Sequence, residues 1–457
     1  MKPYDAKETL NVTPTQHRNN CNTIRNGSML SIPRFRALLP LLAALLFYAH
    51  DAPPAFAQTF APASPEEAGV SSERLARIDA ALEAYVEEER LPGAALVIGR
   101  RGHVVYARAF GYRDREAGEP LEVTDLFRIA SQTKAIISVG VMILQEKGRL
   151  LIDQDLGDFI PEFDSTTVAV SNEDGGFETV PADRKITVRD LLTHSAGIGY
   201  GWGPGAERWE EAGIVGWYFA DRDEPIAETV ERMGNLPMDA QPGEKFVYGY
   251  ATDILGVVIE RASGMPLDEF LRAEIIEPLG MVDTHFYVPP EKAGRLTVVY
   301  SVTEENGMAR APDPGHMVGQ GMYLEGPRKS FSGGAGLVST PGDYARFLEA
   351  LRRGGTLDGA RILSPKTVEL MTVDHVRDAW QGDGGGFGLG FGITEEIGWS
   401  GLPGSPGTYA WGGAYHSTYW VDPAEELVVS YMTQVIPAQG LDDHQRLWAL
   451  IYQALVD

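Results

Sequence analysis

The chain has 457 residues, of which 44% are hydrophobic and 23% are charged. This balance is typical of a packed globular protein and excludes collagen, coiled-coil and disordered classes. Acidic residues number 64 against 39 basic ones, and the net charge of −25 repels phosphate groups. Nucleic acid is therefore not expected as a partner.

The first 57 residues have the pattern of a polar extension followed by a secretory signal peptide. Arg34 and Arg36 precede an apolar run at 37–49, and the small-x-small sequence Ala-Phe-Ala at 55–57 predicts cleavage directly after it. The apolar run is too short for a comfortable membrane span. A buried helix or an uncleaved anchor are the alternatives, and we expect a mature chain without a membrane span.

Two residues of this N-terminal segment bear on the start of translation and on the compartment in which the protein works. Met29 directly precedes the signal, so we expect translation to start there and the preceding residues to be an artefact of the assigned start. Cys21 is the single cysteine and lies in the segment to be removed. A periplasmic or secreted chain without cysteine has no disulfide, no thiol nucleophile and no cysteine-ligated metal.

After a linker at 58–65, we expect one domain over 66–457 in which helices and strands alternate with irregular segments. Apolar residues at helical spacing or in long buried runs predict helices at 72–85, 134–145, 188–193, 252–262, 267–276, 341–353 and 442–456. Short apolar runs beside turn residues predict strand pairs at 94–98 with 104–110 and at 417–421 with 427–432. The glycine-rich segment 382–388 predicts a mobile loop.

The positions of these elements predict the architecture. Strands occur near both ends of the domain, whereas the middle is helical and irregular. We therefore expect an α/β protein of the α+β type, in which one antiparallel sheet is built from both ends of the domain and flanked by helices. A helical lobe is inserted at about 150–330, and the cleft between sheet and lobe is the natural place for an active site.

Ser131 and Lys134 are the candidates for nucleophilic chemistry. They lie three residues apart at the start of the apolar run 134–145, so on a helix they share one face. The helix dipole favours negative charge developing on the hydroxyl, and desolvation would lower the lysine pKa. A neutral lysine could then accept the serine proton. The alternative interpretation is a serine helix cap followed by an exposed lysine.

Five segments in order support the first interpretation. They read FRIASQTK at 127–134, ITVRDLLTHSAG at 186–197, PGEKFVYGY at 242–250, SGGAGL at 332–337 and WGG at 411–413. They resemble the motifs of class C serine β-lactamases, penicillin-binding proteins and family VIII carboxylesterases. The resemblance covers about residues 66–455 and implies a β-lactamase/transpeptidase-like fold that uses neither a cofactor nor a metal.

The resemblance also implies roles for particular residues. Ser131 would be the nucleophile, Lys134 its base and Tyr248 a second base or proton relay. By position, the backbone amides of Ser131 and Ala414 would form the oxyanion hole. The expected substrate contacts are Tyr250, Trp411, Gly412, Gly413 and His416, with the two glycines letting an edge strand approach the substrate closely.

Two departures from the family pattern bear on the substrate. Tyr250 replaces the asparagine of the usual Tyr-x-Asn motif, and Trp411 stands where the lactam-binding relatives have the lysine of Lys-Thr-Gly. That lysine helps to hold the substrate carboxylate, which a tryptophan cannot do. Trp-Gly-Gly at this place resembles the family VIII esterases, so the sequence favours ester substrates.

Three functions are therefore compared. The first is an exported serine hydrolase that cleaves small carboxylic esters through an acyl-enzyme, and the second is a β-lactamase or D-amino-acid peptidase with the same nucleophile. The third is an inactive binder of peptidoglycan-like or small acyl ligands, which the intact motif residues argue against. The sequence leaves the oligomeric state open.

Other hydrolase signals are poor in the expected mature chain. Neither Gly-x-Ser-x-Gly nor His-Glu-x-x-His occurs there. We expect His194 to be structural. Metal-ligand spacing is absent around the remaining histidines, which are His103, His285, His316, His375 and His444.

Overall fold

The computed structural model describes residues 60–376, 379, 384–398 and 401–457. The predicted signal peptide, the first two residues of the expected linker and residues 382–383 of the glycine-rich segment lie outside these described residues.

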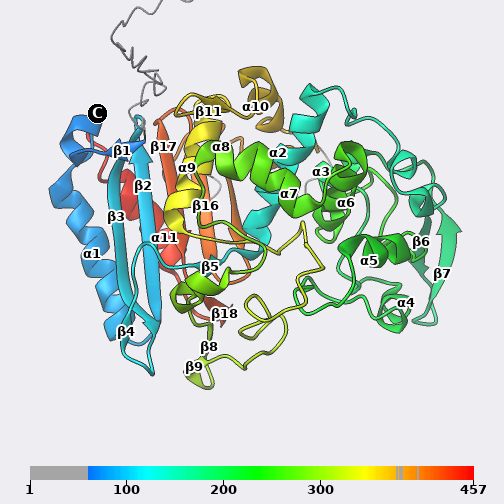
Figure 1. The fold of residues 1–457 in the computed structure, drawn as a ribbon, viewed down its shortest axis with the longest axis horizontal. Coiled ribbons are helices and arrows are strands. Elements are labelled where there is room, and N and C mark those ends of the chain that lie inside the picture. Colours follow the sequence, from blue (N-terminus) through cyan, green and yellow to red (C-terminus); the bar gives the residue numbers. More distant parts are fainter. Residues whose placement is uncertain (1–59, 377–378, 380–383, 399–400) are drawn as a thin grey trace, which may run out of the picture. The chain divides into compact units, whose positions relative to one another are not determined.

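A large sheet joins the two ends of the described chain (Figure 1). Its strands run in the order β1-β3-β2-β17-β16-β15-β14-β13, and β4 pairs with β3 at one end. All neighbours are antiparallel except β1 and β3. The bounds are β1 (Ala61–Pro62), β2 (Gly93–Arg100), β3 (His103–Asp114), β4 (Glu119–Pro120), β13 (Gly385–Phe387), β14 (Gly392–Thr394), β15 (Tyr409–Gly413), β16 (Ser417–Asp422) and β17 (Leu427–Met432). The predicted sheet and both predicted strand pairs are confirmed.

Helices cover both faces of this sheet. The apolar faces of α1 (Ser72–Glu87) and α11 (Asp443–Tyr452) share one core, and α2 (Thr133–Glu146) and α9 (Pro341–Arg352) belong to the other. The short helix α10 (Pro365–Met371) adds buried side chains to the second core.

Strand β2 shows why the sheet is buried on both sides. Successive side chains of a strand point to opposite faces. Leu96 and Ile98 accordingly pack in the core with α1 and α11, whereas Ala95 and Val97 pack in the core with α2 and α9. This is the near-continuous apolar run expected of a strand with helices on both faces.

Helix α9 begins and ends where its sequence predicts. The backbone N–H of Asp343 donates to Oγ1 of the cap residue Thr340 at 3.1 Å, and Pro341 occupies the first turn. Gly354 follows the helix with a φ of 70°, a conformation that glycine adopts at little cost.

The middle of the chain supplies the helical part that covers one end of the sheet (Figure 1). Its helices are α3 (Val188–Leu192), α4 (Ala206–Glu211), α5 (Ile226–Met233), α6 (Ala251–Ser263), α7 (Leu267–Leu271) and α8 (Glu277–Leu279). The helix predicted at 267–276 is divided, because a π-helical turn at Arg272–Ile276 (η5) separates α7 from α8. The 3-10 turns are η1 (Pro65–Ala68), η2 (Ala130–Gln132), η3 (Leu156–Asp158), η4 (Pro161–Phe163) and η6 (Pro290–Arg295).

Four small sheets complete the described structure. One of them joins the end of the middle region to a strand near the C-terminus, so this part of the chain is not purely helical. The sheets pair β5 (Phe127–Arg128) with β10 (Val338–Ser339), β6 (Thr167–Ser171) with β7 (Phe177–Pro181), β11 (Thr356–Leu357) with β12 (Ala360–Arg361), and β8 (Tyr300–Thr303) with both β9 (Gly307–Arg310) and β18 (Val435–Ala438).

Two segments expected to lack regular structure contain strands. Within the expected linker, Ala61 pairs in parallel with His103 of β3. Within the glycine-rich segment, Gly386 pairs with Ile393, and a side chain on Gly386 would overlap the carboxylate of Asp374. The prediction of a loop is therefore wrong for 385–387, because glycine there permits a close contact.

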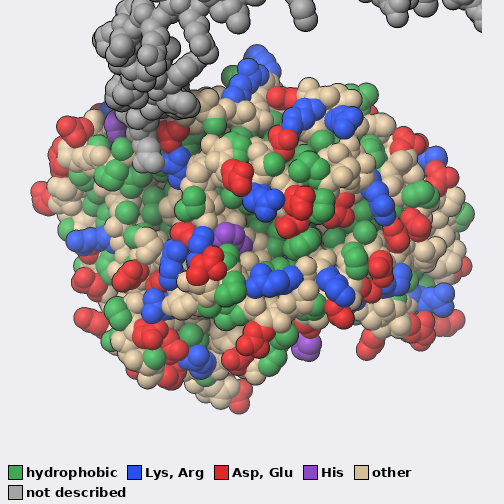
Figure 2. All heavy atoms as spheres, in the orientation of Figure 1, with side chains coloured by type: hydrophobic (Ala, Val, Ile, Leu, Met, Phe, Trp, Pro, Cys, Tyr) green, Lys and Arg blue, Asp and Glu red, His purple; other side chains and the backbone are tan. Residues whose placement is uncertain are grey.

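Charged side chains of both signs are interspersed over the face shown in Figure 2. Across the described residues, no helix is long and apolar enough to cross a membrane.

Candidate active site

Ser131 sits on a tight turn between β5 and α2. The turn is the 3-10 segment η2, and Ala130 before the serine has a φ of 42°. A non-glycine residue in this region is strained, and such strain is concentrated at functional sites. The hydroxyl of Tyr344 on α9 donates to the backbone oxygen of Gln132 at 2.9 Å, which holds the turn against α9.

Lys134 is buried one helical turn after Ser131, with only 2% of its surface exposed. Its Nζ donates to the backbone oxygen of Gly334 at 2.8 Å, to the Tyr200 hydroxyl at 3.0 Å and to Oγ of Ser131 at 3.4 Å. An ammonium group has three N–H donors. All three are therefore used, and the predicted Ser131–Lys134 contact is present.

The protonation of Lys134 differs from the sequence-based expectation. Burial disfavours the ammonium, but the interactions with Tyr200, Tyr248 and Asp253 outweigh it, and together they raise the lysine pKa above its ordinary value. The expectation of a neutral lysine considered desolvation alone. The direction of the pKa shift is the opposite one because the surrounding oxygen atoms favour the charged form.

The carboxylate of Asp253 on α6 is linked to Lys134 through the backbone of one residue, Gly334. Its Oδ1 accepts from the Ser332 hydroxyl at 2.6 Å and from the N–H of Gly334 at 3.0 Å. Gly334 in turn accepts from Lys134 through its carbonyl. A side chain on Gly334 would overlap the Asp253 carboxylate, which explains the glycine in the SGGAGL segment. Burial raises the Asp253 pKa, and the Lys134 charge and the two hydrogen bonds oppose that shift.

Tyr248 lies on the open side of Lys134. The lysine Nζ is 4.7 Å from the centre of the Tyr248 ring, and the tyrosine oxygen accepts from the indole N–H of Trp411 at 3.0 Å. Tyr248 and Trp411, which were predicted from two separate motifs, are thus brought together. The tyrosine hydroxyl that Lys134 contacts directly, however, belongs to Tyr200.

Tyr200 and Asp253 are the two candidate residues that sequence reasoning missed. Tyr200 lies just beyond the THSAG segment and Asp253 lies three residues after Tyr250, so both adjoin the motifs without belonging to them. Burial raises the pKa of Tyr200, and the neighbouring Lys134 opposes it. The signal that could have identified them is a polar residue that adjoins a motif and lies in an otherwise apolar stretch of sequence.

Tyr250 does not contact the cleft, contrary to its prediction as a substrate contact. It is fully buried, donates to the backbone oxygen of Gly216 at 2.7 Å and stacks on Trp209. Its ring also packs edge-on against Tyr200, with centroids 5.0 Å apart. The Tyr250 ring is therefore held in the core, where it packs against Tyr200 and helps to position that residue.

Strand β15 brings the third motif beside the Ser131 turn. Its neighbour β14 pairs with Tyr409 and Ala410, and within the described part of the chain no strand pairs with the WGG segment on that side. A side chain on Gly413 would overlap the backbone oxygen of Ile129, two residues before Ser131. Glycine is therefore required for this approach.

Ser131 opens into a cleft of about 620 Å³. Its walls include Gly412, Gly413, Ala414 and His416, together with Tyr200, Trp202, Trp217, Tyr248 and Trp411. The two residues predicted to supply oxyanion-hole amides thus line one cavity. Trp202 is 61% exposed, so the cleft presents aromatic surface to solvent.

Besides His444, which lines this cleft, two further histidines lie in or close to it in different settings. His194 is buried with its ring 4.6 Å from that of Tyr248, and burial and the Lys134 charge lower its pKa. His416 is partly exposed at the turn between β15 and β16 with a φ of 59°.

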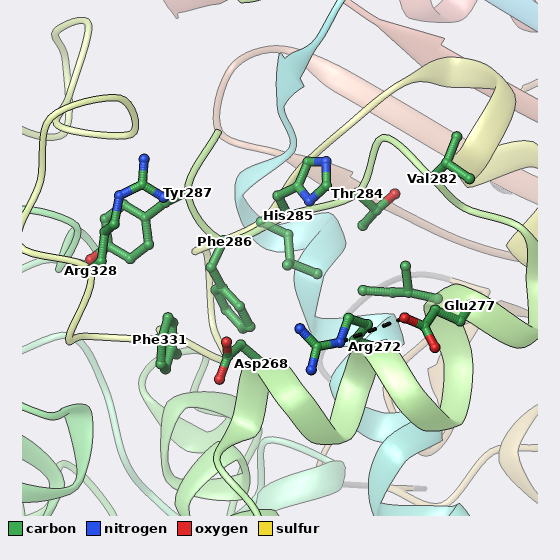
Figure 3. Close-up of a pocket in the computed structure, with 12 residues that line it drawn as sticks. Asp268, Arg272, Glu277, Val282, Thr284, His285, Phe286, Tyr287, Arg328 and Phe331 are labelled. Atoms are coloured by element: carbon green, nitrogen blue, oxygen red, sulfur yellow. Dashed lines mark ion pairs between the residues drawn. The ribbon is translucent and has the colours of Figure 1, made fainter. Parts of the chain in front are cut away.

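A second cavity of about 550 Å³ lies among α7, η5, α8 and the segment after them (Figure 3). Arg272 and Glu277 in its wall form an ion pair at 3.7 Å, and Asp268, His285 and Arg328 also line it. Neither Ser131 nor Lys134 reaches it. Its acidic and basic groups occur side by side, and none of them is a nucleophile next to a buried base.

Comparisons with known proteins agree with the sequence motifs. The family model described as Beta-lactamase matches residues 78–453. Protein Rv1367c of Mycobacterium tuberculosis is 32% identical over 77% of this chain and 88% of its own length. Esterase EstB of Burkholderia gladioli is 32% identical over 78% of this chain and 90% of its own length.

Among solved structures, EstCE1, described as a hydrolase with promiscuous acyltransferase activity, superposes with a TM-score of 0.70 and 27% identity. The match covers 84% of this chain and 98% of EstCE1. The fold is thus β-lactamase/transpeptidase-like, and both named enzymes with a described activity are hydrolases.

Proposed function

Because the chain belongs to the beta-lactamase family, we propose that it is an exported serine hydrolase that cleaves small carboxylic esters. The reaction would pass through an acyl-enzyme on Ser131. The observation that carries this proposal is the contact of a buried, fully hydrogen-bonded Lys134 with the Ser131 hydroxyl in an accessible cleft.

In the acylation step, Oγ of Ser131 attacks the ester carbonyl and forms a tetrahedral oxyanion. The backbone amides of Ser131 and Ala414 are proposed to stabilise that oxyanion. Collapse of the intermediate breaks the ester bond, releases the alcohol and leaves the acyl group on Ser131. Water then attacks the acyl-enzyme, releases the carboxylic acid and restores the hydroxyl.

The proton of Ser131 is assigned to the unit formed by Lys134, Tyr200 and Tyr248. Lys134 and Tyr200 share a buried hydrogen bond, and the lysine Nζ lies over the Tyr248 ring, so the acceptor is the unit rather than one atom. The unit accepts this proton in the form that carries one proton fewer than an ammonium beside two neutral phenols, and the positive charge favoured on Lys134 stabilises the negative charge on a tyrosine oxygen or on Ser131. The alcohol leaving group takes the proton back from the same unit.

The cleft walls support an ester without a carboxylate as the substrate. Five of the lining residues are tyrosine or tryptophan, and no lysine or arginine occurs among the described residues that line the cleft. Trp411 uses its only N–H donor on Tyr248, which leaves an apolar ring for the substrate. A β-lactamase or D-amino-acid peptidase on the same residues is the second candidate, because nucleophile and fold are shared.

Intact-mass measurement after mixing with aryl esters or with penicillins and cephalosporins tests the proposal. We expect a transient acyl adduct on Ser131 with the esters, and no adduct in the Ser131→Ala variant. Adducts and turnover with the lactams equal to or better than those with the esters would favour the second candidate. An adduct that persists in Ser131→Ala would overturn the assignment of the nucleophile.

Export is proposed from the leader sequence alone. N-terminal sequencing of protein recovered from outside the cytoplasm should start at Gln58. Soluble exported protein that still carries Arg34 would contradict the predicted cleavage.

A further inference from the structure

A cluster of three potential metal ligands lies at one end of the cleft, apart from the Lys134 network. One ligand atom each from His416, Asp443 and His444 lies within 4.8 Å of the others, and no second cluster of this kind was found in the described part of the chain. The two imidazoles line the same cavity as Ser131. The carboxylate comes from the first turn of α11 and is fully buried.

The carboxylate is held in place from behind. Oδ2 of Asp443 accepts from the Tyr431 hydroxyl at 2.7 Å, and Oδ1 is 2.7 Å from Nε2 of His416. Metal-binding carboxylates are typically oriented by such outer hydrogen bonds. Tyr431 therefore aims one oxygen of the buried carboxylate towards the histidines.

The two imidazoles are close but need a small adjustment to share an ion. Their rings stack with centroids 4.0 Å apart and planes 15° apart, and Nε2 of His444 donates to the backbone oxygen of His416 at 3.2 Å. Because Nε2 is used in that bond, Nδ1 is the His444 nitrogen that can accept an ion. Zinc bonds of 2.0–2.2 Å place tetrahedral ligand atoms about 3.3 Å apart, so rotation of the partly exposed rings is sufficient.

The backbone at His416 supports a functional interpretation. Its φ of 59° is rare for a residue with a side chain and is kept where the surroundings enforce it. The turn between β15 and β16 thereby holds the His416 ring next to Asp443. The chain's net charge of −25 also favours cations over anions at this site.

We propose that His416, Asp443 and His444 bind a divalent ion of the zinc class at the cleft. Two imidazole nitrogens and one carboxylate oxygen suit zinc, whereas calcium and magnesium prefer oxygen ligands. Three protein ligands leave one coordination position open, and both histidines line the cavity that holds Ser131. An ion bound there narrows the cleft and lowers the turnover of esters.

Zinc binding to the untagged full chain tests the site without any ester substrate. After treatment with a chelator, the protein competes with a chromophoric chelator for added Zn²⁺. We expect one zinc per chain, no binding of Ca²⁺, and at least tenfold weaker zinc binding in His444→Ala. The control is His103→Ala, which changes an exposed histidine outside the cluster and should leave zinc binding unchanged.

Two further variants keep the test decisive if His444→Ala unfolds. His444→Gln retains a side-chain donor for the His416 carbonyl but supplies no imidazole, and Tyr431→Phe removes the hydrogen bond that aims Asp443. Both should weaken zinc binding by about 10-fold or more, with thermal unfolding curves showing that they remain folded. Absence of zinc binding to the unaltered chain, or equal binding by folded His444 variants, would overturn the site.

Inhibition is measured separately on aryl-ester hydrolysis. We expect Zn²⁺ to slow the unaltered enzyme reversibly, with recovery on adding EDTA, and to have at least tenfold weaker effect on His444→Gln. Stoichiometric binding without inhibition would overturn the effect on turnover while leaving the site in place. Zinc binding does not depend on esterase activity, so failure of the proposed function would be recognised independently.

Discussion

The two cavities have similar volumes, about 620 Å³ for the cleft at Ser131 and about 550 Å³ for the cavity at α7 and α8, but their charges are arranged differently. In the second cavity, Arg272 and Glu277 form an ion pair in the wall. Behind the cleft wall, the buried Lys134 donates to three uncharged oxygens, one of which is the Ser131 hydroxyl, and the Asp253 carboxylate is linked to it only through Gly334.

The different placement of the charges indicates which cavity is suited to catalysis. A cation that has a carboxylate partner is already stabilised, whereas an ammonium that donates to a serine oxygen can stabilise negative charge as it develops there. Volume alone would not distinguish the two cavities. Substitutions in each cavity test this comparison.

Ser131→Ala should have the largest effect. Removing the nucleophile is expected to lower kcat/KM for an aryl ester by at least about 10⁴-fold, with thermal unfolding unchanged. Ser138→Ala is a matched control on the same helix, because the Ser138 hydroxyl is buried and lacks a hydrogen-bond partner among the described residues. Ester turnover that survives in Ser131→Ala would show that the cleft reacts through another group.

Asp253→Asn should reduce activity less, by about 10- to 100-fold. The amide can keep the two hydrogen bonds that Oδ1 accepts, but it removes the negative charge that favours the Lys134 ammonium. The alkaline limb of the kcat/KM profile should therefore move to lower pH. Ser332→Ala is the control, since it removes one hydrogen bond and retains the charge. An unmoved alkaline limb in a less active Asp253→Asn would indicate a merely structural role.

Trp411→Lys should change substrate preference rather than abolish activity. We expect the unaltered enzyme to prefer a short-chain aryl ester over a penicillin or cephalosporin by at least about tenfold in kcat/KM, or about 1.4 kcal/mol. A lysine at this place offers a charge to a carboxylate and should narrow that ratio. Trp411→Phe loses the N–H to Tyr248 but keeps an apolar ring, so it should be slower with both substrates at an unchanged ratio.

His285→Gln, in the wall of the second cavity, should leave ester turnover within about twofold. Its effect is on stability, because burial and the nearby Lys292 lower the pKa of His285 to about 4. The folded state binds this proton less readily than the unfolded state, so the histidine destabilises the fold as pH falls from about 6.5 towards 4. We expect the substitution to reduce that loss by about 1–2 kcal/mol, allowing for partial exposure, in urea titrations at several pH values.

Much of the fold could be predicted from local patterns, because its elements are amphipathic or uniformly apolar. The strand pairs, the α9 cap and the apolar α2 depend on residues near in sequence. The strand at 385–387 could not be predicted, since Gly386 is chosen by its contact with Asp374, which no local propensity encodes.

The candidate site divides in the same way. The contact between Ser131 and Lys134 follows from their spacing on a helix. The pKa of Lys134 depends on Tyr200 and Asp253, which approach it from distant segments of the chain. Desolvation by α2 alone predicts a lowered lysine pKa, which is the opposite direction. The burial of Tyr250 could not be predicted, because a position in a motif does not indicate whether the ring faces the cleft or the core.

The protonation state of Lys134 tests the central claim most directly. NMR of protein labelled with ¹⁵N at lysine Nζ, assigned with the Lys134→Met variant, can follow this amine from neutral to alkaline pH. The account predicts that Lys134 remains an ammonium at neutral pH and does not titrate below the range of an ordinary lysine. A Lys134 signal that titrates near neutral pH would show a neutral amine base and contradict the account.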